Sequence, residues 1–258
     1  MNVLKTTIAG LLACSSLALA ANSMAYDAPK AKKAPEIDGN ANDAAWALAA
    51  WRPINNLGAG KQPDSLQDYD GKFKVVWTPE RVYILAEITD DVLYDGHPNP
   101  LEKYWDDDAL EIFIDEDKSG GPHQFSYNAF AYHVALDNQA VDIGPSPDKE
   151  KPNFRTFNDH VKSVWKRSAK SPHTIIWEVA MDVYPDTFKD TYAKGETPAK
   201  PVLLTAGKVM GFMMAYCDND GSKERESFPV SEDVPAVNGD KNRGYIDAGV
   251  FGALKLVE

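Results

Sequence analysis

Short hydrophobic segments separated by turn-forming residues are the feature that most limits how this chain can fold. Eight such segments are rich in β-branched and aromatic residues, and Gly, Pro, Asn and Asp separate them. No long segment with a helical period of 3.6 residues interrupts them. The pattern predicts an all-β protein, an antiparallel β-sandwich of the jelly-roll or immunoglobulin-like kind. The predicted strands are 73–77, 82–88, 109–115, 124–132, 161–165, 175–181, 209–217 and 250–257.

The first 25 residues have the pattern of a secretory signal peptide. Lys5 is followed by an apolar stretch over residues 8–20 and then by the small-residue site Ser23-Met24-Ala25. The apolar stretch is too short for a membrane span, and no later segment offers about 18 consecutive apolar residues. We therefore expect a signal peptide at 1–25, no transmembrane segment, and a periplasmic or secreted protein.

A second way of processing the N-terminus stays open. The run Leu11-Leu12-Ala13-Cys14 resembles a bacterial lipobox, in which Cys14 would be lipidated and would anchor the protein to a membrane. Under the first interpretation Cys217 is the only thiol of the mature chain, so no internal disulfide forms. Since Lys5 is the one charged residue removed, the net charge of −12 becomes −13. This acidic surface excludes nucleic acid and anionic membrane surfaces as expected partners, and leaves neutral sugars and divalent cations.

One large domain accounts for the rest of the chain. The sequence has 258 residues and 43% hydrophobic content, which is enough for the core of a single sandwich. Residues 26–34 are rich in Lys, Ala and Pro and predict a flexible lead-in to a domain at 35–258. The Ala-rich segment 42–51 predicts a short N-terminal helix. Two connections, 89–104 and 182–208, exceed the usual loop length, which is typical of functional loops or insertions.

Polar side chains follow one face of two predicted strands. In 109–115 the period of two places Leu110, Ile112 and Ile114 on the core face and Glu111 on the opposite face. In 124–132 the same period places the three polar side chains on one face. These are Gln124, Ser126 and Asn128. Carboxylates and amides in such positions are suited to the hydroxyl groups of a sugar, although a polar strand face is most often simply solvated.

Two aromatic residues lie close to the ends of predicted strands. Trp105 precedes the strand that carries Glu111, and Tyr245 precedes the last strand. Flat aromatic rings cover the apolar C–H faces of a sugar ring, so both residues are candidate stacking platforms. The alternative is that they fill the core or the rim of the sandwich, because aromatic residues are highly buried on average.

The order of several sequence blocks resembles the family 9 carbohydrate-binding modules. The central block is Trp105-Asp106-Asp107-Asp108-Ala109-Leu110-Glu111-Ile112-Phe113-Ile114-Asp115. The other blocks are Ile37-Asp38-Gly39, Asp43-Ala44-Ala45-Trp46, Val75-Val76-Trp77, Val82-Tyr83-Ile84-Leu85-Ala86, Ile176-Trp177-Glu178-Val179-Ala180, Gly211-Phe212, Asp218-Asn219-Asp220 and Phe251-Gly252-Ala253-Leu254-Lys255-Leu256. The similarity covers nearly the whole mature chain.

This resemblance implies non-catalytic binding of a mono- or oligosaccharide in support of polysaccharide or oligosaccharide use. In such modules two aromatic side chains clamp a sugar end, and these positions fall on Trp105 and Tyr245. The polar positions carry over as Glu111, Gln124 and Asn128. Two departures stand out, because Tyr245 is a Trp in several members, and Ser126 stands where an Arg is expected.

Calcium is the only cofactor that the sequence and the resemblance suggest, and no organic cofactor is expected. Oxygen ligands alternate at Asp115 and Asp117, as in the first half of a calcium loop, but the twelfth position of that loop is Ser126. Family 9 modules often hold structural calcium, which makes Asp218 and Asp220 the second candidate pair. The run Asp106-Asp107-Asp108 is expected to face water, as charged runs usually do.

Hydrolysis of glycosides is a second function that some of these residues could serve. A glycoside hydrolase needs two carboxylates across a cleft, for which Glu111 with Asp107 or Asp115 is the available choice. These modules usually occur fused to glycoside hydrolases, but the resemblance is to a binding module and the chain is not expected to be an enzyme.

A haem-binding or electron-transfer subunit on the same sandwich fold also stays open. C-x-x-C-H is absent, and the side chains available as axial ligands are Met210, Met213, Met214 and His133. The five histidines show no ligand spacing, so no zinc site is predicted, and Cys217 is expected to be an inert buried thiol. The identity and linkage of the sugar and the oligomeric state are not encoded in any of these patterns.

Overall fold

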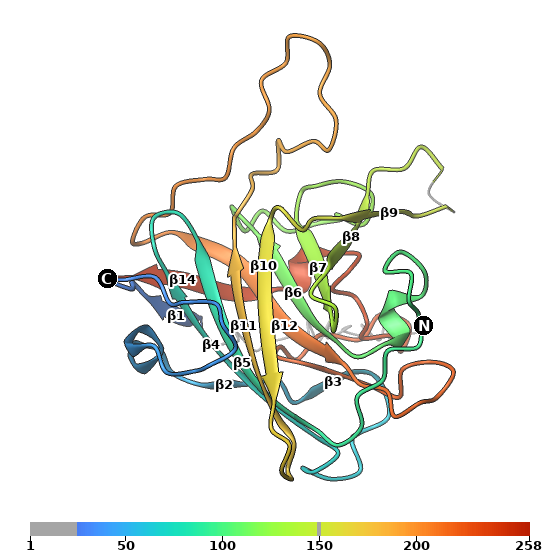
Figure 1. Ribbon diagram of the computed structural model, residues 1–258. Helices are drawn as coiled ribbons and strands as arrows, with labels where there is room; N and C mark the ends of the chain where they lie inside the picture. The colour runs from blue at the N-terminus through green and yellow to red at the C-terminus, as the bar shows by residue number, and fades with distance from the viewer. Residues whose placement is uncertain (1–24, 149–150) are drawn as a thin grey trace, which may run out of the picture.

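Two β-sheets packed face to face form the protein in the computed structural model, which describes residues 25–148 and 151–258 (Figure 1). The strands are β1 Tyr26–Pro29, β2 Arg52–Pro53, β3 Asn56–Gly60, β4 Tyr69–Trp77, β5 Val82–Asp90, β6 Ala109–Asp115, β7 Phe130–Ala135, β8 Ala140–Gly144, β9 Asn153–Thr156, β10 Val161–Arg167, β11 Thr174–Met181, β12 Val209–Cys217, β13 Ser227–Val230 and β14 Gly252–Val257. Three short 3-10 helices accompany them, η1 Ala44–Leu48, η2 Tyr104–Asp106 and η3 Ala248–Val250.

The larger sheet follows the order β1-β14-β12-β6-β7-β8-β9, with β13 paired to β12 and β3 paired to β13. The smaller sheet follows the order β10-β11-β5-β4-β2. The strand pairs are antiparallel except for β1 and β14, which run parallel. The predicted antiparallel sandwich is therefore confirmed, with one parallel pair at its edge.

The main core lies between the two sheets. Leu110, Ile112 and Ile114 of β6 belong to it, as the period of two predicts, and they are at most 2% exposed. Trp77 of β4 and Trp177 of β11 enter the same core from the smaller sheet and are fully buried. Burying one such large side chain contributes about 1.5 to 3 kcal/mol, so the core fixes the register of both sheets.

The opposite face of β6 carries a second, smaller core. Ala109 and Phe113 of β6 pack there with Met213 of β12 and Phe251, under the segments that connect β13 to β14. Glu111 lies between Ala109 and Phe113 on this same face. The outer face of the larger sheet is thus covered at one end, and Glu111 is buried instead of solvated, with 8% of its surface exposed.

The predicted N-terminal helix is confirmed as η1. Trp46 is 2% exposed on the outer face of the smaller sheet, and its Nε1 donates to Oε1 of Glu178 at 2.9 Å. The other oxygen of Glu178 accepts the backbone N–H groups of Asp38 and Gly39. One buried carboxylate therefore attaches the segment 38–46 to β11.

The lead-in predicted at 26–34 is wrong where it meets the sheet. Tyr26–Pro29 forms β1, which pairs with Leu254–Val257 of β14. Tyr26 is 7% exposed, and its hydroxyl donates to the Ala50 carbonyl and accepts the Val75 N–H. The Lys- and Pro-rich composition concealed the alternation of Tyr26 and Ala28 toward the core. Residues 1–24 of the predicted signal peptide, with Cys14, lie outside the described residues.

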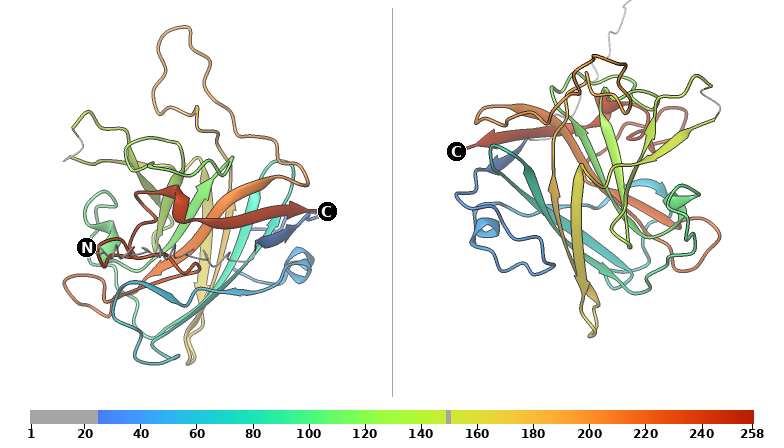
Figure 2. Two further views of the ribbon diagram at one scale, coloured as in Figure 1. Left: turned by 180° about the vertical axis from the view of Figure 1, so that it is seen from behind. Right: turned by 45° about the horizontal axis from the view of Figure 1, so that its top comes forward.

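The long connection 182–208 leaves the sandwich between β11 and β12 and projects at the top of Figure 1, and Figure 2 shows the same projection from behind. Its base is attached to the fold, because the Val202 N–H donates to the Val183 carbonyl and Leu204 is 2% exposed. Among residues 25–148 and 151–258, no helix has the length and apolar character to cross a membrane.

Candidate binding pocket

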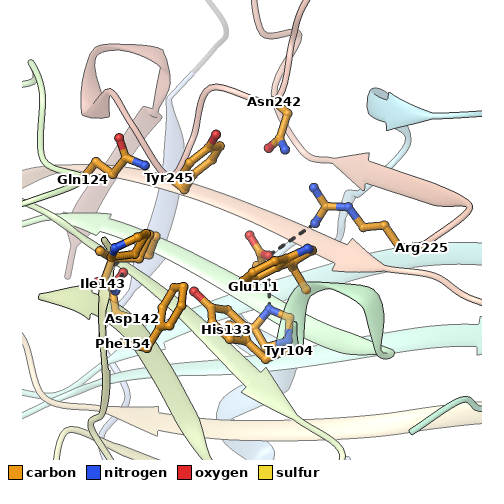
Figure 3. A pocket seen from close by; sticks show the side chains of 13 residues that line it. Tyr104, Glu111, Gln124, His133, Asp142, Ile143, Phe154, Arg225, Asn242 and Tyr245 are labelled. Carbon is orange, nitrogen blue, oxygen red and sulfur yellow. Dashed lines mark hydrogen bonds and ion pairs between the residues drawn. The ribbon is translucent and has the colours of Figure 1, made fainter. Parts of the chain in front are cut away.

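A pocket of about 310 Å³ lies on the outer face of the larger sheet, over β6, β7, β8 and β9. Glu111 of β6 stands directly across from His133 of β7 in the ladder, and Asp142 and Ile143 of β8 follow next to them. Figure 3 shows these side chains pointing toward a common space, with Tyr245 facing them from the opposite side. Regular strand geometry therefore places polar groups on the floor of the pocket, and connecting segments supply its walls.

Aromatic rings form one wall. Tyr104 and Trp105 come from η2 and Phe154 comes from β9, and all three rings contact one another with centroids 5.2 to 5.8 Å apart. Trp105 keeps 37% of its surface exposed although it belongs to this cluster. Its ring is therefore held in place by its neighbours and is still open to a ligand.

Tyr245 lines the same pocket from the segment before β14. The neighbouring Gly244 packs closely on β6 and β12, because a Cβ added there would lie 2.6 Å from Met213 and 2.7 Å from Phe113. The His123 ring Nε2 lies 2.7 Å from the Gly244 carbonyl, which attaches the same segment to the loop that carries Gln124. The two predicted aromatic platforms, 140 residues apart in sequence, thus border one cavity.

Glu111 is a buried carboxylate with positively charged and hydrogen-bonding partners. Its Oε1 is 3.2 Å from Nδ1 of His133, 3.7 Å from Nη1 of Arg225 and 3.4 Å from Sγ of Cys217. Burial by itself raises the pKa of Glu111, but the hydrogen bond and charge of His133, with the Arg225 charge, outweigh it and hold the pKa below its ordinary value. The pocket therefore keeps an ionised acceptor on its floor at neutral pH.

Asp142 is a second carboxylate in the pocket lining, with a different environment. Its two oxygens accept the backbone N–H groups of Ala131 at 2.9 Å and of Ile143 at 2.7 Å. Burial is the main cause that raises the pKa of Asp142 from 3.8 to about 7. Because both oxygens of Asp142 already accept backbone hydrogen bonds, this side chain is part of the pocket floor but has little capacity to accept hydrogen bonds from a ligand.

The predicted strand 124–132 is wrong in its first half. Residues 123–128 form turns, with the Ser126 N–H donating to the His123 carbonyl, and β7 begins only at Phe130. Gln124 still lines the pocket, but Asn128 does not; its Nδ2 donates to the Gly120 carbonyl at 2.8 Å. Alternation along a strand therefore does not explain the position of Gln124.

Six polar or aromatic residues of the pocket lining were not predicted as sugar contacts, and these are Tyr104, His133, Asp142, Phe154, Arg225 and Asn242. Arg225 and Asn242 come from connecting segments without a strand pattern, and Phe154 comes from a strand that was not predicted. His133 was considered only as a haem ligand, because the predicted strand ended one residue before it. A correct register for β7 would have placed His133 opposite Glu111.

The methionines named as possible haem ligands lie in the interior. Met210 and Met214 belong to the core between the sheets, and Met213 belongs to the smaller core on the other face of β12. The carboxylates named as partners of Glu111 for hydrolysis are also elsewhere. Neither Asp107 nor Asp115 lines the pocket as the structure describes it.

The run Asp106–Asp108 is buried, contrary to the expectation that it faces water. Its three side chains are at most 6% exposed. Asp107 accepts the N–H groups of Gly96 and His97, and Asp108 accepts those of Tyr94 and Asn219. These bonds hold the connection 91–103 and the segment after β12 against η2, so the run is a local network of turn contacts.

A cluster of acidic side chains lies behind this network. Asp90 and Asp218 are at most 4% exposed, and each has an oxygen Oδ1 without a hydrogen-bond partner among the described residues. Nearby, one carboxylate oxygen from each of Asp68, Asp91 and Asp220 lies within 4.8 Å of the others. We call these five residues the acidic cluster.

The cations near the acidic cluster, Arg167 and Lys61, do not offset the burial and mutual repulsion of its carboxyl groups. Burial, followed by the charges of Asp90, Asp68 and Asp220, raises the pKa of Asp218 from 3.8 to about 8. Burial raises the pKa of Asp90 and of Asp108 as well. Without a bound cation these carboxyl groups hold protons that exposed ones would have lost.

The four predicted calcium ligands fall into two separate pairs. Cys217, next to Asp218, pairs with Ala109 at one end of β6, whereas Asp115 pairs with Gly211 at the other end. Seven residues of strand, about 20 Å, separate the two ends. At the far end Asp115 accepts the Gly120 N–H and Asp117 accepts the Ser119 N–H, which are bonds within one tight turn.

Known proteins resemble this chain over most of its length. The model of the family described as "Carbohydrate family 9 binding domain-like" matches residues 37–258. Endo-1,4-beta-xylanase A of Thermotoga neapolitana is 26% identical over 146 residues, which are 55% of this chain and 13% of the xylanase. The chain thus spans about an eighth of the length of that curated relative.

Solved structures share the fold. A family 9 carbohydrate-binding module from Caldicellulosiruptor kristjanssonii in complex with cellotriose superposes with a TM-score of 0.61 at 20% identity, covering 91% of this chain and 94% of the module. The glucose complex of a module from the same organism gives a TM-score of 0.60 at 20% identity, with coverage of 89% and 95%. At this level of identity the likeness concerns the sandwich itself.

Proposed function

Because the chain belongs to the carbohydrate family 9 binding domain-like family, a family of binding modules, we propose that its pocket binds one terminal unit of a glucose-type oligosaccharide without transforming it. The observation that carries the proposal is that Trp105 and Tyr245 border the same cavity as Glu111. Two aromatic rings and an ionised acceptor are the groups that the faces and the rim of a pyranose ring require.

The size of the pocket supports recognition of a chain end. A volume of about 310 Å³ is at the lower end of the range of about 300 to 1,000 Å³ found for small-molecule sites. The floor is closed by β6, β7 and β8, and Phe154 and Tyr104 close one side. A continuous polysaccharide chain would need an open groove, whereas this shape encloses one or two sugar units.

Charge compensation on the floor supports binding of a neutral ligand. The negative charge of Glu111 is balanced by Arg225, and both side chains line the pocket. Arg225, Gln124 and Asn242 offer N–H donors, and Glu111 and the amide oxygens offer acceptors. A neutral hydroxyl-bearing ring can use both kinds of group without leaving a buried charge unpaired.

The glucose and cellotriose complexes of the structural neighbours support glucose-type sugars as the first ligands to test. Tryptophan fluorescence and calorimetry should be followed during titration with glucose, cellotriose, xylose and xylotriose. We expect saturable binding of cellotriose, with each added sugar recovered unchanged by chromatography. A flat titration with every sugar of the panel would contradict the proposal, and cleaved cellotriose would show that the chain is an enzyme.

The acidic cluster is proposed to hold calcium. The donor set fits, because Ca²⁺ prefers six to eight oxygen ligands, and Asp90 and Asp218 each have a buried oxygen with no partner in the described part of the chain. Asp68, Asp91 and Asp220 would complete the set from the exposed side. A bound cation would neutralise the repulsion that raises the pKa of Asp218.

The other predicted pair fits calcium less well. Asp115 also has a buried oxygen without a partner among the described residues, but it has only Asp117 as a companion. Asp117 is bonded within its own turn, and the Lys118 ammonium group donates to the Gly252 carbonyl at 3.3 Å beside it. We therefore assign the proposed calcium to Asp218 and Asp220, and not to Asp115 and Asp117.

Export is proposed from the N-terminal sequence, with the sugar-binding domain acting in the periplasm or outside the cell in support of carbohydrate catabolism. Mass spectrometry of the native protein is expected to find a mature chain that begins at Tyr26. A chain that begins at a lipid-modified Cys14 would support the membrane-anchored alternative instead.

A further inference from the structure

Three side chains with metal-binding atoms converge beneath the pocket floor. A carboxylate oxygen of Glu111, a ring nitrogen of His133 and the sulfur of Cys217 all lie within 4.8 Å of one another. All three residues are buried, at 8%, 1% and 0% exposure. We propose that Glu111, His133 and Cys217 form a site for one thiophilic divalent cation of the zinc type, distinct from the acidic cluster.

The strand register explains why these three residues meet. Glu111 of β6 pairs with His133 of β7 on one side and with Ala215 of β12 on the other. Cys217 is two residues beyond Ala215, so its side chain projects from the same face of the sheet. The three donors therefore stand on adjacent strands of a rigid sheet, and their mutual positions do not depend on loops.

Two of the three distances between the donors are close to those of a tetrahedral site, and the third, between His133 and Cys217, is within 4.8 Å. Zinc lies about 2.0 to 2.2 Å from nitrogen and oxygen ligands and about 2.3 Å from thiolate sulfur, which places neighbouring ligands of a tetrahedron about 3.3 to 3.5 Å apart. Oε1 of Glu111 is 3.2 Å from Nδ1 of His133 and 3.4 Å from Sγ of Cys217. The mixture of carboxylate, imidazole and thiolate favours zinc, cobalt or copper over calcium or magnesium.

A cationic group already lies at this position. Nη1 of Arg225 is 3.1 Å from Sγ of Cys217 and 3.7 Å from Oε1 of Glu111, and the guanidinium group stacks on the Phe228 ring at 4.0 Å. Glu111 and Cys217 thus already contact a positive charge, and Figure 3 marks the contact between Glu111 and Arg225 with a dashed line. A metal ion has to displace the Arg225 head group, and Arg225 borders the pocket into which it can move.

Metal binding releases one proton from the Cys217 thiol to solvent and moves the His133 ring proton from Nδ1 to Nε2. Nε2 has no hydrogen-bond partner within the described residues and can take the proton, and the bonds to the metal replace the hydrogen bonds that Nδ1 and the Cys217 thiol make to Oε1 of Glu111. The bonds that form are those from the metal to Sγ, Nδ1 and Oε1, and the fourth position faces the pocket. A metal here binds the same Glu111 carboxylate that lines the proposed sugar pocket, so metal and sugar compete.

Cobalt(II) is the probe that tests this site, because a thiolate–cobalt bond gives an intense charge-transfer absorption that carboxylate ligands do not give. Titration of the mature chain from Tyr26, kept reduced, is expected to show this absorption with one cobalt bound and to reverse on addition of zinc. Cys217→Ser should lose the absorption, whereas the control Asp220→Asn, in the acidic cluster, should keep it. Arg225→Gln, which removes the competing charge, should bind cobalt about tenfold or more tightly.

The outcomes separate this site from the acidic cluster and from the sugar proposal. Absence of the absorption in both wild type and Arg225→Gln would overturn the proposal, and so would its persistence in Cys217→Ser. If Cys217→Ser does not fold, His133→Gln retains the thiol and should still weaken cobalt binding. No sugar enters these titrations, so a failed sugar titration leaves their result unaffected.

Discussion

Glu111 and Asp218 are buried carboxylates on either side of the segment 104–108, and their pKa values are shifted in opposite directions. On the pocket side, His133 and Arg225 hold the pKa of Glu111 below its ordinary value. On the other side, burial and neighbouring carboxylates raise the pKa of Asp218 to about 8. The same burial thus leads to a charged acceptor where hydrogen bonds and nearby cations outweigh it, and to a protonated group where neighbouring carboxylates add to it.

The comparison teaches what each side is suited to bind. On the pocket side the negative charge of Glu111 is balanced by Arg225, which is appropriate for a neutral ligand such as a sugar. The acidic cluster has an excess of negative charge, and Asp90 and Asp218 each have a buried oxygen without a partner among the described residues. Such a site is appropriate for a cation from solvent. The segment between them links the two, because Trp105 faces the pocket while Asp106 accepts the Arg225 N–H and Asp108 accepts the Asn219 N–H.

Removing the acceptor on the pocket side should have the largest effect. Glu111→Ala leaves Arg225 and His133 without their buried partner, and we expect a loss of about 3 to 5 kcal/mol in the free energy of unfolding. Urea unfolding monitored by circular dichroism measures this. The control is Lys189→Ala, which removes an ion pair with Glu196 that is 54% and 41% exposed and should cost less than about 1 kcal/mol. Equal midpoints for the two variants would contradict the comparison.

Removal of calcium from the acidic cluster by a chelator should lower the stability of the protein. With calcium at about a hundred times its dissociation constant, its removal should cost about 2.7 kcal/mol, which corresponds to a fall of about 5 to 10 °C in the melting temperature. Asp218→Asn should abolish this response to chelator. Asp117→Asn, at the far end of β6, should retain it, and the reverse result would place the cation in the β6–β7 turn.

Truncation of the exposed indole should weaken sugar binding with little effect on the fold. We expect Trp105→Ala to lose about 1.5 to 3 kcal/mol of binding free energy to cellotriose, the contribution of one buried aromatic contact. Trp51 is 39% exposed, compared with 37% for Trp105, and does not line the pocket, so Trp51→Ala is the matched control. If both variants bind cellotriose equally, Trp105 is not a stacking platform.

The pH dependence should differ between the two sides when chelator is present. The folded-state pKa of Asp218 lies above its unfolded value, so the folded protein holds an extra proton between about pH 4 and pH 8. Its contribution to stability is present at the acidic end of this window and is lost as the pH rises, by about 1.4 kcal/mol per pH unit and proton. Unfolding at pH 6 and pH 7 should show this slope in wild type and a smaller one in Asp218→Asn. On the pocket side Glu111 remains ionised over this range and Asp142, with its pKa raised to about 7, is the carboxyl group that titrates, so any change of sugar affinity between these two pH values should disappear in Asp142→Asn.

The sandwich could be predicted from the sequence because its longer strands have a clear local pattern of β-branched and aromatic residues. β6 and β12 were predicted with their observed bounds, since β-branched and aromatic runs end there in clear turn residues. The short strands β1, β2 and β3 were not predicted, because their pairing partners are distant in sequence and supply the stability that their own composition lacks. These segments are strands because of their tertiary contacts and not because of their own composition.

The site was predictable only in part for a related reason. Trp105, Glu111 and Tyr245 were found next to recognisable strands, and the structure brings them together in the lining of one pocket. Arg225 and Asn242 come from irregular segments whose positions depend on the network around Asp106–Asp108, which the sequence presents only as a run of charges. The burial of those charges is a property of the assembled loops.

The parallel pairing of β1 with β14 sets the order in which this domain can be completed. β1 is an edge strand whose ladder is formed with residues 254–257, and Tyr26 fills a place in the main core. A ribosome or a translocation channel delivers Tyr26 more than two hundred residues before that partner. β1 therefore stays unpaired until β14 has been delivered, and the larger sheet is completed only when these two strands pair.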